Sequence, residues 1–298
     1  MNSRAKLLLT VIVATTVCAG VAWSQSPTAK PTDDWARYSL IAQRLETVAY
    51  RISVRNAELC PNANTRVLGL VPTLSDPALN DYAEEAGPLT ISWVVPGSPA
   101  AGSGLRKGDR ILDIDGDQLP SGSGALEQLI DRLLDRSKSV VSLGIERARS
   151  RSRVTVRPTS ACNYKVALFP SEDVNAFTRQ RYVVITEGML ALLPRDEQLA
   201  VVVGHEFGHI LAGHTEGEVD PSLSSDRELQ ADYLGIYLAA RAGYDVSGAK
   251  EVLQRIAAAH NRNGEYMSDI AQRLRAIETA IGEIDAKRSH GESLLPSE

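Results

Sequence analysis

The spacing of apolar positions changes along the chain, and the changes predict a mixed α+β fold. Recurrence every three or four residues, typical of amphipathic helices, runs over residues 40–52 and 124–134. The same spacing returns in the last third of the chain and predicts helices over residues 197–211, 223–240, 247–260 and 268–284. Short apolar runs typical of strands occupy residues 91–95, 140–145, 154–156 and 182–186.

The first 24 residues have the layout of a secretory signal peptide. Arg4 and Lys6 give a positive start, an apolar run follows over residues 7–17, and Ala22-Trp23-Ser24 offers a cleavage site. The run is shorter than the roughly 20 residues of a membrane span, so an uncleaved anchor is the second choice. A lipid anchor on Cys18 is disfavoured by the large residue before it. We expect export to the periplasm or cell envelope of a bacterium, where peripheral membrane association is compatible with the sequence.

Composition and charge narrow the function. The 298 residues carry a formal net charge of -5 without a long basic run, so a nucleic-acid partner is not expected. Of three cysteines, Cys18 would leave with the signal peptide, and Cys60 and Cys162 remain. An even pair in an exported protein favours a disulfide bond, with two buried free thiols as the alternative.

Residues 63–158 are richer in strand and turn signals than the rest of the chain. The stretch over residues 97–116, which begins Gly-Ser-Pro-Ala-Ala-Gly and ends Asp-Ile-Asp-Gly, resembles the core of a PDZ domain of the bacterial protease type. Leu68-Gly69-Leu70 falls where such domains place the loop that binds a ligand's carboxylate. The resemblance implies a C-terminal peptide ligand, held by backbone N–H groups and an exposed strand edge. An ordinary turn into a strand is the alternative for this tripeptide alone.

The candidate chemistry lies in the pattern H-E-x-x-H, here His205-Glu-Phe-Gly-His209. Histidines at i and i+4 share one helical face, so both rings can reach one zinc ion at about 2.0–2.1 Å. Glu206 can accept the proton of a water that zinc activates. The pattern also occurs on ordinary helices, but an almost wholly apolar run over residues 199–203 precedes it here, and buried ionisable groups need partners. We therefore predict one zinc ion per chain and hydrolysis of protein or peptide substrates.

A third ligand is expected downstream of the motif. Glu228 and Asp232 lie one turn apart on the next predicted helix, and Glu228 is the preferred ligand. His214 is the alternative, but it follows His209 by five residues, where the three-histidine protease pattern has six. Asp232 is expected to accept the free N–H of a zinc-binding histidine, with a solvated carboxylate as the alternative. His260 is expected at the surface.

Together these motifs resemble the CAAX-prenyl-protease and HtpX type of zinc peptidases. His205-Glu-Phe-Gly-His209 paired with Glu228-x-x-Ala-Asp232 carries the resemblance, which spans about residues 165–285 and includes the pair Asn175-Ala176. It implies a mainly helical gluzincin-type core with a small sheet whose edge strand holds the substrate. It makes His205, His209 and Glu228 the zinc ligands, Glu206 the catalytic base, and Asn175 and Ala176 candidate substrate-binding residues.

The resemblance departs from the family near the last predicted helix. The family often has a Ser-His-Pro turn followed by an arginine, and Met267-Ser268-Asp269 replaces that turn here, although Arg273 falls near the expected arginine. Arg273 is therefore a candidate for stabilising the oxyanion, and a surface arginine on an amphipathic helix is an equal alternative. Substrate is expected to lie extended along residues 182–186.

The predicted organisation interrupts the peptidase with the PDZ-like β domain. Its parts are a signal peptide (1–24), a linker with the N-terminal peptidase helix (25–62), the PDZ-like domain (63–158), the zinc metallopeptidase core (159–286) and a flexible tail (287–298). We expect a zinc-dependent endopeptidase of the bacterial envelope that acts on unfolded or misfolded proteins. A PDZ-containing adaptor or chaperone with a structural zinc is one alternative, which the intact Glu206 disfavours. A thermolysin-like protease is another, which Arg227 and Ala231 disfavour because that family has Asn and Ser there.

Overall fold

The computed structural model describes most of the chain beyond the expected signal peptide. The described residues are 31–60, 64–73, 89–120, 122–135, 137–179, 181–214, 224–262 and 269–297. The signal peptide predicted over residues 1–24 and the linker up to residue 30 lie outside these ranges. The predicted α+β class is confirmed, because helices and antiparallel or mixed sheets both contribute to the fold.

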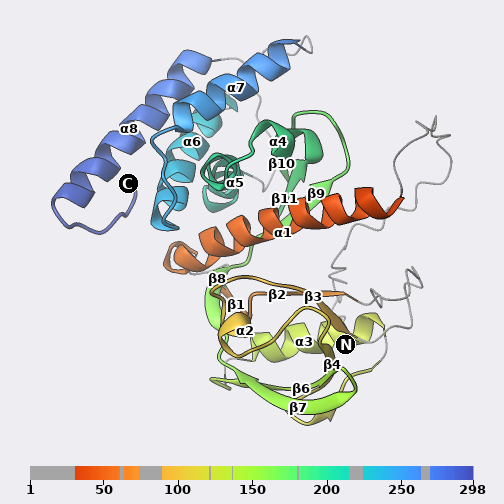
Figure 1. The fold of residues 1–298 in the computed structure, drawn as a ribbon. Helices are drawn as coiled ribbons and strands as arrows, with labels where there is room; N and C mark the ends of the chain where they lie inside the picture. The colour runs from red at the N-terminus through yellow and green to blue at the C-terminus, as the bar shows by residue number, and fades with distance from the viewer. Residues whose placement is uncertain are drawn as a thin grey trace, which may run out of the picture.

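Two separate hydrophobic clusters divide the molecule. The larger one collects buried side chains from the N-terminal helix and from residues 168–284, and the smaller one lies wholly within residues 68–156. In Figure 1 the helix α1 (Pro31–Arg55) lies between the helical part and the domain that holds the smaller cluster. Leu45, Val48 and Ile52 of α1 belong to the larger cluster. The inserted domain therefore interrupts a single larger core.

The larger core is built mainly from helices with a small sheet on one side. The helices after the insertion are α4 (Glu187–Leu192), α5 (Asp196–Leu211), α6 (Ser224–Arg241), α7 (Ala249–Arg262) and α8 (Ile270–Ser289). The small sheet has the order β10 (Ala176–Arg179), β11 (Tyr182–Thr186), β9 (Lys165–Phe169), with β11 antiparallel to β10 and parallel to β9. Helix α5 is buried on most sides because its residues 199–203 are all apolar, and Leu199, Ala200 and Val203 are fully buried.

The inserted domain is a twisted sheet with one helix packed against it. The sheet runs in the order β2 (Leu70–Thr73), β3 (Thr90–Val94), β4 (Arg110–Ile114), β6 (Val141–Arg147), β7 (Ser150–Val156), and β5 (Asp117–Gln118) pairs with β4. Two helices complete the domain, α2 (Pro99–Gly102) and α3 (Ser123–Leu134). Ala125 and Leu129 of α3 are buried against the sheet, which matches the spacing that predicted this helix. Strand β2 lies at one end of the sheet, with one edge unpaired within the described residues.

A short two-stranded ribbon joins the inserted domain to the larger core. Strand β1 (Asn64–Val67) pairs antiparallel with β8 (Thr159–Cys162), and Asn64 lies opposite Cys162. Cys60, just after the short helix η1 (Ala57–Leu59), forms the predicted disulfide bond with Cys162. The bond closes a loop of 102 residues, which stabilises the fold by about 4–5 kcal/mol in the chain-entropy account.

The helix expected over residues 40–52 begins earlier, at Pro31. One prediction about the other end of the chain is wrong. The tail predicted to be flexible from residue 287 instead completes α8 and then returns along α6 up to residue 297. The carbonyl of Leu294 accepts a hydrogen bond from Arg241, and the backbone N–H of Ser297 donates one to Tyr233.

None of the helices in the described part of the chain has the length and apolarity to span a bilayer.

Glu46 of α1 gives the fold a pH-dependent stability. Burial raises its pKa from 4.5 to about 7. The folded state therefore holds this proton more tightly than the unfolded state, so stability falls as the pH rises from about 4.5 to about 7. Glu46→Gln removes this penalty, and its gain in free energy of unfolding should grow from near zero at pH 4 to about 1–3 kcal/mol at pH 8.

Urea denaturation at several pH values measures this gain. Glu251→Gln, an exposed position on α7, is the matched control and should differ from the parent by less than about 0.5 kcal/mol throughout. A gain for Glu46→Gln that is equal at pH 4 and pH 8 would contradict the assignment of the pH dependence to this carboxyl group.

Candidate metal centre

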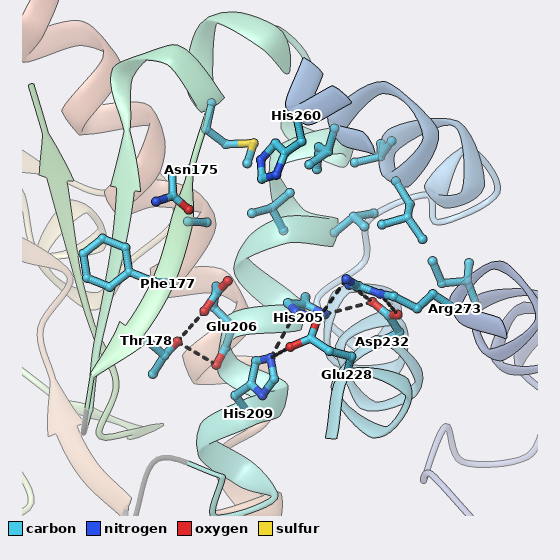
Figure 2. Close-up of a pocket in the computed structure, with 18 of the residues that line it drawn as sticks. Asn175, Phe177, Thr178, His205, Glu206, His209, Glu228, Asp232, His260 and Arg273 are labelled. Carbon is cyan, nitrogen blue, oxygen red and sulfur yellow. Dashed lines mark hydrogen bonds and ion pairs between the residues drawn. The ribbon is translucent and has the colours of Figure 1, made fainter. Parts of the chain in front are cut away.

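Helices α5 and α6 approach so closely that their backbones touch, and this contact builds the site. A Cβ atom at Gly204 of α5 would lie 2.5 Å from the carbonyl oxygen of Gly235 on α6. Any larger residue at either position would force the helices apart. The close crossing sets His205 and His209 of α5 opposite Glu228 in the first turns of α6 (Figure 2).

Three side chains meet at one point between the two helices. The Nε2 atoms of His205 and His209 are 3.1 Å apart, and they lie 3.4 Å and 3.3 Å from the carboxylate oxygens of Glu228. A tetrahedral zinc ion with bonds of about 2.0–2.1 Å has ligand atoms roughly 3.3 Å apart. The separations and the two-histidine, one-carboxylate donor set therefore fit a zinc ion. The structure brings together the three ligands that the sequence predicted.

Asp232 and Arg273 form the layer behind these three residues. Asp232 Oδ1 lies 2.8 Å from Nδ1 of His205, which leaves Nε2 of that ring directed at the shared point. Arg273 of α8 contacts Asp232 through Nε and Nη2 at 2.7 and 2.9 Å, and its Nη1 lies 2.9 Å from Glu228. Arg273 is only 7% exposed, so the alternative of a surface arginine is wrong. All three guanidinium nitrogens face carboxylates, an arrangement that favours a positioning role over direct contact with an oxyanion.

The charges around the site favour a positive charge between the two rings. Burial lowers the pKa of His205, but hydrogen bonds with Asp232 and Glu228 outweigh burial and raise it to about 10. Burial raises the pKa of Glu228, but the hydrogen bonds from His205 and His209 outweigh it and hold that pKa well below its usual range. The same carboxylates that favour a proton on His205 favour a metal cation in its place, and metal binding would release that proton.

His209 has its own outer partner, which the sequence analysis did not identify. Its Nδ1 lies 3.0 Å from Nδ1 of His214, and Nε2 of His214 lies 2.9 Å from the side-chain oxygen of Gln230. His214 thus meets the ring of His209 on the side away from the shared point. The structure brings Glu228 to that point and places His214 behind a ligand, so the geometry disfavours His214 as the third ligand.

Glu206 points from α5 toward the small sheet. It is 6% exposed, and the hydroxyl of Thr178 on β10 donates a hydrogen bond to its Oε2 at 2.6 Å. Figure 2 shows the Glu206 carboxylate between β10 and the converging histidines. Thr178 was missed by the sequence analysis because no local pattern links it to a residue 28 positions later.

The strand that borders the site is β10, and not the strand predicted from the sequence. Substrate was expected along residues 182–186, but that strand is β11, which pairs with β10 on one side and β9 on the other. A strand with both edges paired cannot accept a further strand. The edge strand at the cleft is β10, which begins at Ala176 directly after Asn175. Both candidate substrate-binding residues therefore lie at the rim of the cleft.

A cleft of about 540 Å³ connects these groups. Its floor carries the titratable side chains of α5 and α6, and its walls are largely apolar, with Met189, Val202, Leu253, Ile256 and Ile277 among them. His260 of α7 belongs to this wall, and its Nε2 lies 2.8 Å from the carbonyl oxygen of Val174. His260, expected at the surface, is half-buried and lines the cleft. An apolar cleft with a few convergent polar groups is the usual form of an active site.

The inserted domain contains an ordered loop at Leu68-Gly69-Leu70, the tripeptide predicted to bind a ligand's carboxylate. The carbonyl of Leu68 accepts a hydrogen bond from Ala100 N–H, and the carbonyl of Gly69 accepts one from Val95 N–H, each at 2.9 Å. In a trans peptide the N–H points away from the carbonyl, so the N–H groups of Gly69 and Leu70 face the unpaired edge of β2. Gly69 has φ of +76° and a Cβ there would lie 2.2 Å from Ser98, so only glycine fits. The loop has the form expected of a carboxylate-binding loop, a role that stays a prediction.

Two segments of the chain match known protein families. Residues 145–220 match the model of peptidase family M48, and residues 90–147 match that of the PDZ domain. The chain contains an M48 peptidase domain and a PDZ domain. The M48 match includes His205, Glu206 and His209, whereas Glu228 and Asp232 lie beyond its last residue.

A curated relative supports the same assignment. The mitochondrial metalloendopeptidase OMA1 of Arabidopsis thaliana is 25% identical over 151 residues, a match that covers 40% of this chain and 31% of the relative. The chain thus spans about a third of that protein's length. Together the M48 match and this relative support a metalloendopeptidase.

Several solved structures are similar to about a third of the chain. The PDZ domain of HtrA3 with a phage-derived ligand is 24% identical, with a TM-score of 0.27, and covers 33% of this chain and 88% of that one. A serine endoprotease from Yersinia pestis is 15% identical, with a TM-score of 0.25, and covers 33% of this chain and 30% of that one.

Proposed function

We propose that this chain is a zinc-dependent endopeptidase of the bacterial cell envelope that cleaves unfolded or misfolded proteins. One observation carries the proposal. The side chains of His205, His209 and Glu228 converge at one point on the floor of an apolar cleft, and Glu206 lies beside them. A zinc site that serves only structure is closed by four protein ligands, whereas three ligands with a neighbouring carboxylate are typical of catalytic sites. The M48 match supports the same reaction class.

The residues of the cleft divide the work of peptide hydrolysis. Zinc held by His205, His209 and Glu228 would polarise the scissile carbonyl and lower the pKa of a water molecule to about 7. Glu206 accepts a proton from that water and later delivers it to the leaving amine. Thr178 holds one oxygen of Glu206, which leaves the other free to accept the proton.

Strand β10 has one unpaired edge within the described residues, and this edge explains why unfolded chains are the expected substrates. An extended peptide can add to this edge through backbone hydrogen bonds, and such addition needs a segment without fixed structure. Asn175 and Ala176 at the start of β10 would contact the substrate backbone.

The sequence features of residues 1–24 support export, and N-terminal sequencing of the exported protein would test cleavage after Ser24.

Removal of zinc tests the proposed function directly. Dialysis against a chelator should lower the rate of casein digestion on the order of 10³-fold, because the metal supplies several kcal/mol of transition-state stabilisation. One equivalent of zinc should restore the rate, and magnesium should not, because nitrogen ligands disfavour magnesium. Undiminished digestion by protein shown to be metal-free would rule the proposal out.

Thr178 offers a subtler test of how Glu206 is positioned. Thr178→Val removes the hydroxyl that donates to Glu206 but keeps the shape of the side chain. The loss of a hydrogen bond to a charged group should lower kcat about 10- to 100-fold and leave zinc content unchanged. Thr178→Ser keeps the hydroxyl and should recover most of the activity. Equal kcat values for the valine and serine variants would show that the hydrogen bond is unimportant.

A further inference from the structure

A second and larger cavity, of about 1260 Å³, lies between the PDZ domain and the M48 domain. Its lining includes one side of α1, strand β2 with the loop Leu68-Gly69-Leu70, helix α3 and one face of the small sheet, together with residues of β1, β3 and β8. The PDZ groove between β2 and α3 therefore does not open to bulk solvent alone. It opens onto a surface of the peptidase domain.

The sheet face in this cavity is the outer one. Alternate residues of β11 separate the two faces: Val183 and Ile185 are buried in the larger core, whereas Tyr182 and Val184 line the cavity. Phe169 and Phe177 stand on the same outer face and are 49% and 45% exposed. Large exposed aromatic rings that gather at a cavity are typical of a binding surface.

The cavity and the metal cleft meet at the edge strand β10. Phe177 and Arg179 line both of them, while Ala176 and Thr178 between these residues line the metal cleft. The two hollows therefore share one rim, and the shared rim is the strand along which we expect substrate to lie.

The charges in the larger cavity point to an anionic ligand. Arg66, Lys165 and Arg179 line it, and Glu46 is the one acidic residue among the described residues of its lining. Burial raises the pKa of Glu46 to about 7, so part of its negative charge is absent near neutral pH. A positive lining on a chain of net charge -5 fits a ligand that carries a free carboxylate.

The chain's own C-terminal segment does not supply that carboxylate from within the described residues. Residues 290–297 lie along α6 and α8, where Leu294 and Ser297 are hydrogen-bonded to Arg241 and Tyr233. Within the described residues no segment of the chain fills the cavity, which favours another molecule as its occupant.

We propose that one substrate polypeptide occupies both hollows at once, with its C-terminal carboxylate at Leu68-Gly69-Leu70 and its upstream residues crossing the outer sheet face to β10 and the metal cleft. This inference rests on the proposed peptidase function and adds a rule of specificity. The enzyme cuts near the C-terminus of its substrate, at a position counted from that terminus. Because an extended chain advances about 3.3 Å per residue, the length of the path fixes that count.

Two synthetic unstructured peptides of identical sequence test the proposal, one with a free C-terminal carboxylate and one with a C-terminal amide. The zinc-loaded protein should cleave the free acid with kcat/KM higher on the order of 10- to 100-fold, because the second contact raises the local concentration of substrate. Mass spectrometry of the products should place the cut at a constant distance from the C-terminus. A Gly-Ser-Gly-Ser insertion between the cut and the C-terminus should move the cut four residues toward that terminus in the original sequence.

Phe169→Ser tests the path between the two hollows, because Phe169 lines the larger cavity and not the metal cleft. Its ratio of free-acid to amide cleavage should fall toward one. Leu40→Ser is the matched control, since Leu40 is 67% exposed on α1 outside the cavity lining, and it should keep the parental ratio.

The outcomes separate this inference from the proposed function. Cleavage of neither peptide by zinc-loaded protein would contradict the peptidase assignment itself. Equal cleavage of both, at sites independent of the C-terminus, would overturn the single-chain path and leave the peptidase assignment intact. Faster cleavage of the amide would also overturn it, because the PDZ domain would then restrain its ligand. So would a parental protein that is dimeric in ultracentrifugation and becomes monomeric with Phe169→Ser, since a second copy would then fill the cavity.

Discussion

Glu206→Gln should keep its zinc and lose proteolysis. The amide has nearly the shape of the carboxylate and can still receive the hydrogen bond from Thr178, but it cannot accept a proton from water. General-base catalysis contributes about 10²- to 10⁴-fold, so kcat for casein or an unstructured peptide should fall by that factor. KM should change little, because Glu206 is not expected to hold the ground-state substrate.

The metal content of the Glu206→Gln variant decides how the loss is read. One zinc ion per chain together with lost activity supports the role of a base. Glu197→Gln in the first turn of the same helix is the matched control and should retain the parental rate. A Glu206→Gln variant that turns over at the parental rate would show that another group takes the proton.

His209→Ala should abolish zinc binding, whereas His214→Ala should keep one zinc ion per chain. The difference follows from geometry, because His209 directs Nε2 at the shared point and His214 meets the opposite side of the His209 ring. Loss of an outer partner typically costs 10- to 100-fold in metal affinity, so His214→Ala should bind zinc more weakly by about that factor. Competition with a coloured zinc chelator measures both effects.

Glu228→Ala completes this comparison and discriminates between the two candidate third ligands. It should weaken zinc binding far more than His214→Ala, because it removes a ligand atom from the site. The reverse order, with zinc retained by Glu228→Ala and lost by His214→Ala, would transfer the ligand role to His214. Circular dichroism of each variant would confirm that the helices are intact.

The parts of the site that follow from local geometry could be predicted from the sequence. The i, i+4 spacing of His205 and His209 fixes both rings on one face of α5, and the same spacing relates Glu228 to Asp232 on α6. Helices such as α3 and α5 were also predicted to within a residue or two, because their apolar spacing directly reflects the side that is buried. The disulfide bond was predicted from the two cysteines, Cys60 and Cys162, that lie outside the expected signal peptide.

The parts that depend on distant packing could not be predicted. Strand β10 has only four residues, Ala-Phe-Thr-Arg, and it exists because it pairs with β11. The edge was therefore assigned to the more apolar strand next to it. Arg273 lies 41 residues from Asp232, so its burial against two carboxylates depends on how α8 packs against α6. The tail looks polar in sequence, yet two hydrogen bonds between its backbone and the side chains of Arg241 and Tyr233 on α6 hold it.

The short distance between the two ends of the PDZ insertion has a consequence for the peptidase core. The Cα atoms of Cys60 and Cys162, at the two ends of the PDZ insertion, are 5.5 Å apart. The ends of an ordinary β-turn lie within about 7 Å of each other. The two ends are therefore close enough for a short hairpin turn to replace the PDZ module, and such a replacement leaves α1 packed against the same helices. The same geometry makes this junction a natural place to exchange one recognition module for another.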